Sequence, residues 1–267
     1  MKLLSARPAI VLGLIALVAG CGGGGGSTGP VPPGSASPPA TATPPPTTTP
    51  SAPPTATPTP PGASTQTVDT FAGSVFGTPS ALLPTEGNTS SGGQGQPIDG
   101  KTCDPTQYNN YHVHFFLGLW VNGSPVAIPS GVGMFLPGPP VNGFVDTASC
   151  VYYIHTHDSS GIIHIEDPDP AGTPITQSIY TLKQFFDEWG ITVNANQVGP
   201  FTGPVRVFTS GPVYRGGIPS QTTPASDLTF YGTDATTVPL YSYELIYIEV
   251  GTMFPPTLPN VRFYEEH

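Results

Sequence analysis

Basic residues are scarce in this sequence. Only 7 of its 267 residues are Lys or Arg, against 17 Asp and Glu. Two of those bases, Lys2 and Arg7, lie in the N-terminal segment considered next, and without them five bases face 17 acids, a net charge of −12. Contact with nucleic-acid phosphates or anionic lipid headgroups needs clustered Lys and Arg. The composition therefore predicts no nucleic-acid partner and no electrostatic adhesion to lipid.

Long apolar runs are also rare. The clearest one, residues 9–18, follows the two N-terminal bases in the charge order of a secretory signal and is too short to span a bilayer as a stable helix. It leads into L-V-A-G-C at residues 17–21, which resembles the bacterial lipobox. We expect a lipoprotein signal peptide over residues 1–20, lipidation at Cys21 and a membrane as partner through that lipid, with an uncleaved anchor as the alternative.

Large side chains are missing from the segment that follows. Residues 21–66 are almost entirely Gly, Pro, Ser, Thr and Ala, a composition that cannot bury enough apolar surface to offset its ordering entropy. We expect a disordered tether there, a weakly ordered extension over residues 67–100 and a globular domain over 101–267. In lipoproteins of double-membrane bacteria, Gly22 after the lipidated cysteine implies the outer membrane, so we expect an extracytoplasmic protein anchored by lipid to a bacterial membrane, at the outer membrane or the cell surface.

Only three cysteines are present, and lipidation of Cys21 leaves two, Cys103 and Cys150. An isolated pair outside the cytoplasm usually oxidises, so we expect a disulfide. It would connect the segment before His112 to the segment before His155. In the competing interpretation the two thiolates are soft ligands for copper or zinc.

The segment after residue 100 reads as short strands with one helix. Residues 111–121 are rich in aromatic and β-branched side chains, and the Asn-Gly pair at 122–123 predicts a hairpin returning over 125–128. One amphipathic helix is predicted over 182–189, where Thr181 is the N-cap and Gly190 ends the helix. Further strands are predicted over residues 204–209, 213–215, 242–250 and 260–264. The fold class is therefore α+β, mostly β, with antiparallel sheets of short strands.

Five of the six histidines fall between positions 112 and 164. Two His-x-His pairs and a His-x-Glu pair place alternate side chains on one face of a strand, where imidazoles can converge on a metal. The candidate ligands are His155, His157, His164, His112, His114 and Glu166, and the expected ion is copper or zinc. In the alternative interpretation the histidines are half-buried or solvent-facing spacers of polar strands.

The number of histidines on one face depends on the hairpin at residues 150–166. If its loop has an even count with Ser159 and Ser160 at the tip, opposed positions sum to 319 and His155 faces His164. Under the same pairing His157 faces Ile162, and His157, His164 and Glu166 share that face. An odd loop would send His164 and Glu166 to the other face. Asp158 opens the turn, where its side chain is expected to accept bonds from backbone amides, with a role beside His157 as the alternative.

Two known metal-site patterns fit poorly. A cupin needs a glutamate a few residues after His-x-His, whereas Glu166 comes nine after His157. The strand at 111–114 looks like the copper strand of Cu/Zn superoxide dismutase, but the later zinc loop has no counterpart. Residues 101–200, above all H-T-H-D-S-S-G-I-I-H-I-E, resemble a group of uncharacterised extracytoplasmic bacterial and archaeal proteins. That resemblance implies a fold unit and a residue pattern, and no activity.

Three functions remain open on sequence grounds. The first is a tethered lipoprotein that binds a transition metal for storage, sensing or delivery. The second is a metal-dependent oxidoreductase or hydrolase, which needs an open coordination position and a base such as Glu166. The third is a metal-free adhesion or interaction module. The sequence points to no particular protein or small-molecule partner.

Overall fold

The computed structural model describes residues 29, 58–59, 61–168, 178–212, 221–223 and 228–263. The chain divides into two units, Met1–Pro53 and Pro54–His267, and the described part belongs almost wholly to the second. The expected signal peptide, Cys21, most of the tether, the strand at 213–215 and His267 lie outside the described residues. Among the residues that are described, no helix is long and apolar enough to cross a membrane.

The described residues of the second unit are mostly β with one α-helix, so the α+β, mostly β prediction is confirmed. The strands are β1 (Gly62–Thr70), β2 (Tyr111–Val121), β3 (Ser124–Val126), β4 (Met134–Pro137), β5 (Ala148–Val151), β6 (Ile154–His155), β7 (Ile162–Asp167), β8 (Val193–Asn194), β9 (Gln197–Val198), β10 (Phe201–Thr202), β11 (Val205–Thr209), β12 (Gln221–Thr223), β13 (Thr229–Gly232), β14 (Leu245–Val250) and β15 (Thr257–Phe263). The helix is α1 (Leu182–Trp189), and a 3₁₀ turn, η2, covers Ala235–Thr237.

A seven-stranded sheet organises the unit. Its order is β13-β11-β14-β2-β7-β6, with β3 paired to β2 off this path. Strand β2 is the longest of them and lies between β14, to which it is parallel, and β7, to which it is antiparallel. The short strand β6 closes one edge. Residues from β2, β7 and β6 are therefore neighbours across the sheet.

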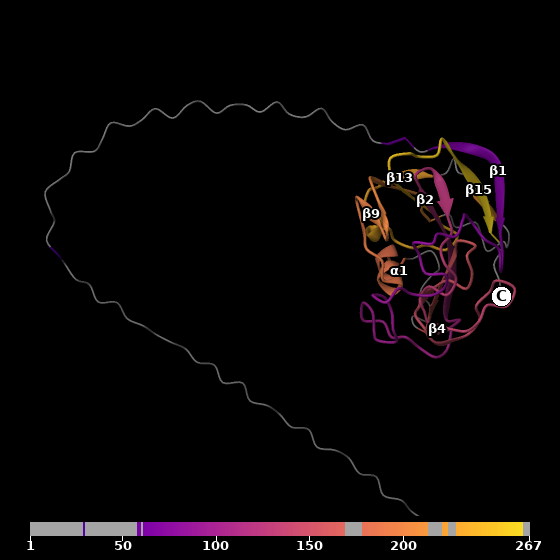
Figure 1. Ribbon diagram of the computed structural model, residues 1–267, viewed down its shortest axis with the longest axis vertical. Helices are drawn as coiled ribbons and strands as arrows, with labels where there is room; N and C mark the ends of the chain where they lie inside the picture. Colours follow the sequence, from indigo (N-terminus) through magenta and orange to yellow (C-terminus); the bar gives the residue numbers. More distant parts are fainter. Residues whose placement is uncertain are drawn as a thin grey trace, which may run out of the picture. The chain divides into compact units, whose positions relative to one another are not determined.

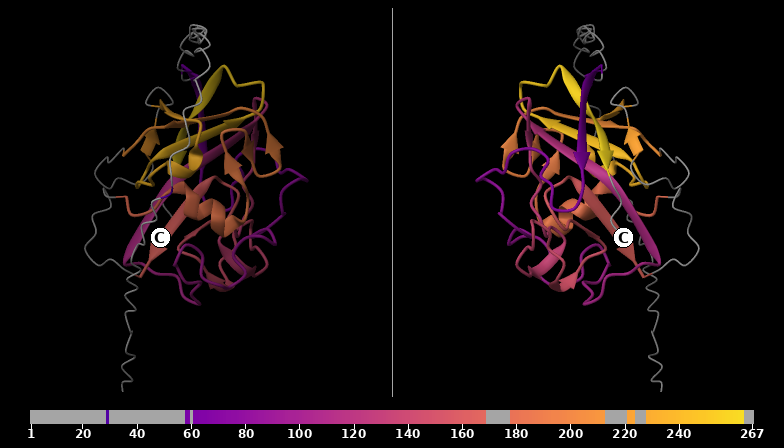
Figure 2. Two further views of the ribbon diagram at one scale, coloured as in Figure 1. Left: turned by 90° about the vertical axis from the view of Figure 1, so that its left-hand side faces the viewer. Right: turned by 90° about the vertical axis from the view of Figure 1, so that its right-hand side faces the viewer.

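The two faces of this sheet carry different cores. On one face, alternate residues of β2 such as Phe115 and Leu117 pack with Phe185 and Trp189 of α1. On the other face, Phe116 packs with Phe76 and with residues of β15. Figure 2 shows α1 on one side of the sheet and the pair β1 and β15 on the other, and Figure 1 shows β1 and β15 side by side, away from α1. The period-two pattern of β2 thus divides its side chains between two buried layers.

Local signals placed the turn and the helix correctly. Asn122 and Gly123 have φ of 47° and 82°, as a tight hairpin turn requires, and β3 returns along β2. The Thr181 amide donates to Gln184 Oε1 at 2.6 Å, and Gly190 ends α1 with a φ of 81°. Both sets of residues do what their sequence pattern predicts.

The N-terminal part of the unit is built into the fold. Strand β1 starts at Gly62, inside the stretch expected to be tether, because it pairs in parallel with β15. Phe76 and Leu83 are both buried, so residues of the expected weak extension contribute to the core. The predicted disulfide is present between Cys103 and Cys150, with 5.3 Å between the Cα atoms. The interpretation of these cysteines as metal ligands is therefore wrong.

Candidate metal centre

The hairpin at residues 150–166 has the even register. Ile154 pairs with Ile165 and His155 with His164, so the opposed positions sum to 319. The Glu166 amide donates to the Tyr153 carbonyl at 2.8 Å and continues the same register. His155, His164 and Glu166 consequently share one face, as the even turn requires.

Strand β2 joins the hairpin through direct pairing with β7. His114 lies opposite His164, and His112 lies opposite Glu166. The two His-x-His pairs therefore meet because β2, β7 and β6 are adjacent strands. The Cys103–Cys150 bond lies near this region, but the sheet register aligns the histidines.

His157 reaches the cluster by a different path from the one expected. The ladder ends at His155, since the Thr156 amide donates to the Val132 carbonyl instead of continuing along β7. His157 Nδ1 then lies 2.6 Å from the Val145 carbonyl, and its ring stacks on Phe144 at 4.5 Å between centroids. His157 is thus held by residues 144–145 and not by the expected pairing with Ile162.

Two imidazoles present unprotonated nitrogens to each other. His155 Nδ1 lies 3.0 Å from the Tyr152 carbonyl, and His157 Nδ1 makes the contact with Val145. A carbonyl oxygen only accepts, so in each neutral ring the proton is on Nδ1 and Nε2 carries a lone pair. These two Nε2 atoms are 3.2 Å apart. Two facing lone pairs repel unless a cation lies between them, and a backbone carbonyl on the other nitrogen is the usual support of a metal-bound histidine.

Glu166 brings a carboxylate to the same place. Its Oε1 lies 3.9 Å from His155 Nε2, 3.8 Å from His164 Nδ1 and 3.3 Å from His112 Nε2. Its Oε2 is buried and has no hydrogen-bond partner among the described residues. A buried carboxylate oxygen without a partner is costly, and a bound cation would remove that cost.

Burial disfavours the charged form of each of these groups. It lowers the pKa of His155 and His164 well below the ordinary histidine value, and the neighbouring histidines add to the effect. Burial also lowers the pKa of His157 and raises that of Glu166 to about 7. Neutral imidazoles are the form that binds metals, so the histidines are in their ligand form at neutral pH.

The six groups form two overlapping sets of possible metal ligands. One contains His155, His157, His164 and Glu166, all buried, and the other contains His112, His114 and His164. Within each set the donor atoms lie within 4.8 Å of one another. The protein therefore has buried histidine and glutamate side chains positioned to bind a metal.

A cavity of about 350 Å³ opens onto the cluster. Four of the possible ligands, His112, His157, His164 and Glu166, line it together with Phe144. The remaining lining is small or polar and consists of Ala72, Gln107, Asn109 and Asp146. His155, which is fully buried, lies behind this wall. The cavity gives ions and small molecules a route to the donors.

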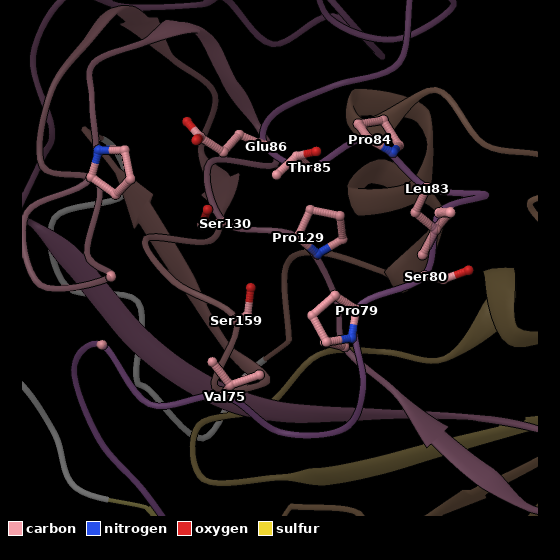
Figure 3. Close-up of a pocket in the computed structure, with 15 residues that line it drawn as sticks. Val75, Pro79, Ser80, Leu83, Pro84, Thr85, Glu86, Pro129, Ser130 and Ser159 are labelled. Carbon is pink, nitrogen blue, oxygen red and sulfur yellow. The ribbon is translucent and has the colours of Figure 1, made fainter.

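A second cavity, of about 430 Å³, is lined in part by residues adjacent in sequence to residues that line the first. Gly73 and Gly143 line this cavity, whereas Ala72 and Phe144 line the first. Figure 3 shows Val75 and Ser159 close together, with Pro79 and Pro129 nearby and Glu86 further along the wall. Its lining is mostly apolar and contains no histidine.

Asp158 acts on the backbone, as the turn chemistry predicts. Its Oδ1 accepts the Ser160 amide at 2.8 Å, and its Oδ2 accepts the Gly73 amide at 2.7 Å. The second bond attaches residues 71–76 to the hairpin tip, where the Phe76 amide also donates to the Ser159 carbonyl. Asp158 therefore holds a loop that contributes to both cavities.

Sequence reasoning missed the residues that support the ligands. Tyr152 and Val145 act through their carbonyls, which any residue type supplies, so no sequence pattern could have identified them. Phe144 and Gln107 lie in irregular segments whose position is set by the tertiary fold. Gly133 has a φ of 77° and packs against β6 so closely that a Cβ at this position would lie only 2.3 Å from the Ile154 carbonyl oxygen. Its position in a Gly-rich loop was the only available signal.

Comparison with models of known protein families, with curated proteins and with solved structures gave no match.

Proposed function

We propose that the chain is a lipid-anchored extracytoplasmic protein whose domain binds a transition metal ion, copper or zinc, for storage, sensing or delivery. The first ligand set, His155, His157, His164 and Glu166, holds the ion. The facing Nε2 lone pairs of His155 and His157, 3.2 Å apart, carry the proposal. A tetrahedral ion with bonds of about 2.1 Å places neighbouring ligand atoms about 3.4 Å apart, close to this separation.

The donor set favours copper or zinc over harder cations. Mg²⁺ and Ca²⁺ take oxygen ligands, whereas this set is three imidazoles and one carboxylate. Both remaining cysteines are in the disulfide, so no thiolate takes part. An imidazole-rich site without sulfur suits Zn²⁺ and Cu²⁺.

The location follows from the N-terminal sequence. Lipidation of Cys21 would attach the chain to a membrane, and the Gly/Pro/Ser/Thr segment would separate the domain from the lipid. A disulfide is the expected state of a cysteine pair in an oxidising compartment, which agrees with a position outside the cytoplasm. We favour the outer membrane or the cell surface.

Metal analysis of the purified protein tests the binding site. We expect stoichiometric copper or zinc after loading and desalting, and an increase in melting temperature on adding either ion. At a free ion concentration 100 times the Kd, the gain is about 2.7 kcal/mol, or roughly 5–10 °C for a domain of this size. His155→Gln and His157→Gln should abolish this increase.

His267→Gln is the matched control, because it changes the one histidine outside the cluster. It should bind and shift like the wild type. Absence of both bound metal and thermal shift in the wild-type protein would contradict the proposal. A loss of metal binding in His267→Gln equal to that in His155→Gln or His157→Gln would also contradict it.

A metal-dependent enzyme is the second candidate, favoured by the cavity. A catalytic ion needs a position open to substrate, and four possible ligands line a cavity of about 350 Å³. Glu166, with its pKa raised to about 7 by burial, is the group that could accept a proton there. Filling the cavity at Ala72→Phe would separate the two functions, since it should abolish turnover while leaving bound metal unchanged.

A further inference from the structure

The cluster contains more donors than a single ion uses. Zinc in proteins takes four ligands and at most about five. Around one ion with bonds of about 2.1 Å, two ligand atoms are at most about 4.2 Å apart. The structure divides the six side chains into two sets that share only His164. His112 and His114 therefore do not simply complete the first set.

The second set is as compact as the first. His112 and His114 project from the same face of β2, with 4.6 Å between their ring centroids. His114 Nε2 lies 3.0 Å from His164 Nδ1. His112 and His114 come from β2, on one side of His164 in β7, whereas His155 comes from β6 on the other side.

We infer that a second transition metal ion binds among His112, His114 and His164, beside the ion of the proposed function, on which this inference rests. Glu166 connects the positions. Its Oε1 lies 3.3 Å from His112 Nε2 and 3.8 Å from His164 Nδ1, and its Oε2 is buried without a hydrogen-bond partner among the described residues. Two ions bridged by the two oxygens of a carboxylate lie about 3.5–4 Å apart in two-metal sites.

The two positions differ in their access to solvent. The His112 side chain is 26% exposed and lines the cavity, while His155 is 0% exposed and lies behind it. The second ion therefore has the most exposed ligand of the cluster, and we expect it to leave first when a chelator is added. All four ligands of the first ion are buried, so we expect this ion to be retained longer.

Counting ions in the whole purified protein tests the inference. We load it with Cu²⁺, desalt it, and measure bound copper by mass spectrometry and spin intensity by electron paramagnetic resonance. The expected result is two ions per chain with a spin signal well below two isolated Cu²⁺ ions, because ions about 4 Å apart couple magnetically. Chelator should remove them in two phases of similar amplitude.

Variants separate the two positions. His112→Gln with His114→Gln should bind one ion with a full, uncoupled signal, and that remaining ion shows that the variant has folded. His112→Gln alone, at the more exposed position, should reduce occupancy of the second ion and remove the fast phase. His267→Gln should keep two coupled ions.

The outcomes distinguish this inference from the proposed function. No bound copper in the wild type would overturn both. One ion in the wild type would overturn the second site alone and make His112 and His114 supporting neighbours of Glu166. Two uncoupled ions, or two ions retained in the double variant, would place the second ion elsewhere. Loss of both ions in a double variant that is folded would contradict two separable positions.

Discussion

Replacing Gly133 with alanine should displace His155 while leaving every metal-ligand residue unsubstituted. Gly133 has a φ of 77°, and an added Cβ would lie 2.3 Å from the Ile154 carbonyl and 2.8 Å from His155 Cβ. A Cβ atom cannot lie closer than 3.0 Å to such an atom unless one of the two segments moves. The backbone of β6 must therefore move by roughly 0.7 Å, more than the tolerance of about 0.2 Å for a metal ligand distance.

The magnitude follows from two contributions. A left-handed backbone costs an alanine about 1 kcal/mol relative to glycine. Overpacking against a buried strand adds about 1–3 kcal/mol. We expect Gly133→Ala to lose about 2–4 kcal/mol of unfolding free energy and to bind zinc about 10- to 100-fold more weakly, the range found when the support of a ligand is lost.

Gly100→Ala is the matched control. Gly100 also has a φ of 77°, but nothing lies within 4 Å of its added Cβ. It should lose only the backbone contribution of about 1 kcal/mol and keep its zinc affinity. Denaturant unfolding and zinc titration by calorimetry measure both quantities. Equal losses in the two variants, or unchanged zinc affinity in Gly133→Ala, would refute the reasoning.

Three further changes test other parts of the site. Glu166→Gln should alter proton release on zinc binding: with a pKa of about 7 the carboxyl holds about 0.9 proton at pH 6 and about 0.1 at pH 8. Calorimetry in buffers of different ionisation enthalpy should therefore show that Glu166→Gln releases about 0.9 fewer protons than the wild type at pH 6 and about 0.1 fewer at pH 8. Glu86→Gln, which removes an exposed carboxyl group, should release as many protons as the wild type. His155→Gln should flatten the pH dependence of the metal-free protein. The pKa of His155 is lowered in the fold, so only the unfolded chain binds this proton, and wild-type stability falls relative to the variant by up to about 1.4 kcal/mol per pH unit below 6.5. A constant difference between the two proteins from pH 7 to 5.5 would contradict that burial effect. Cys103→Ser with Cys150→Ser should cost about 2–4 kcal/mol, because the bond closes a loop of 47 residues. Zinc affinity should stay within about threefold at 25 °C, since the sheet register and not the disulfide aligns the ligands; a loss of binding in the folded double variant would oppose this explanation.

The sequence predicted those features that depend on neighbouring residues. The Asn122-Gly123 turn, the caps of α1 and the face shared by His155 and His164 all follow from local backbone geometry, and all three are present. Alternation along β2 also placed His112 and His114 on one face, opposite the layer packed on α1.

Features that depend on contacts between residues far apart in the chain could not be predicted from the sequence. Direct pairing of β2 with β7 joins residues about 50 positions apart, and its register comes from the packing of both sheet faces. The position of His157 depends on the Val145 carbonyl, and the start of β1 at Gly62 depends on β15 at the other end of the chain. Such contacts leave no periodic pattern, because each partner supplies only backbone atoms.

The most direct test of the central claim is anomalous X-ray diffraction from crystals of the zinc-loaded protein. We expect a zinc peak between His155 and His157, about 2.0–2.1 Å from both Nε2 atoms, with Glu166 turned toward it. A zinc ion bound elsewhere, with the two Nε2 atoms still in contact and no density between them, would contradict it.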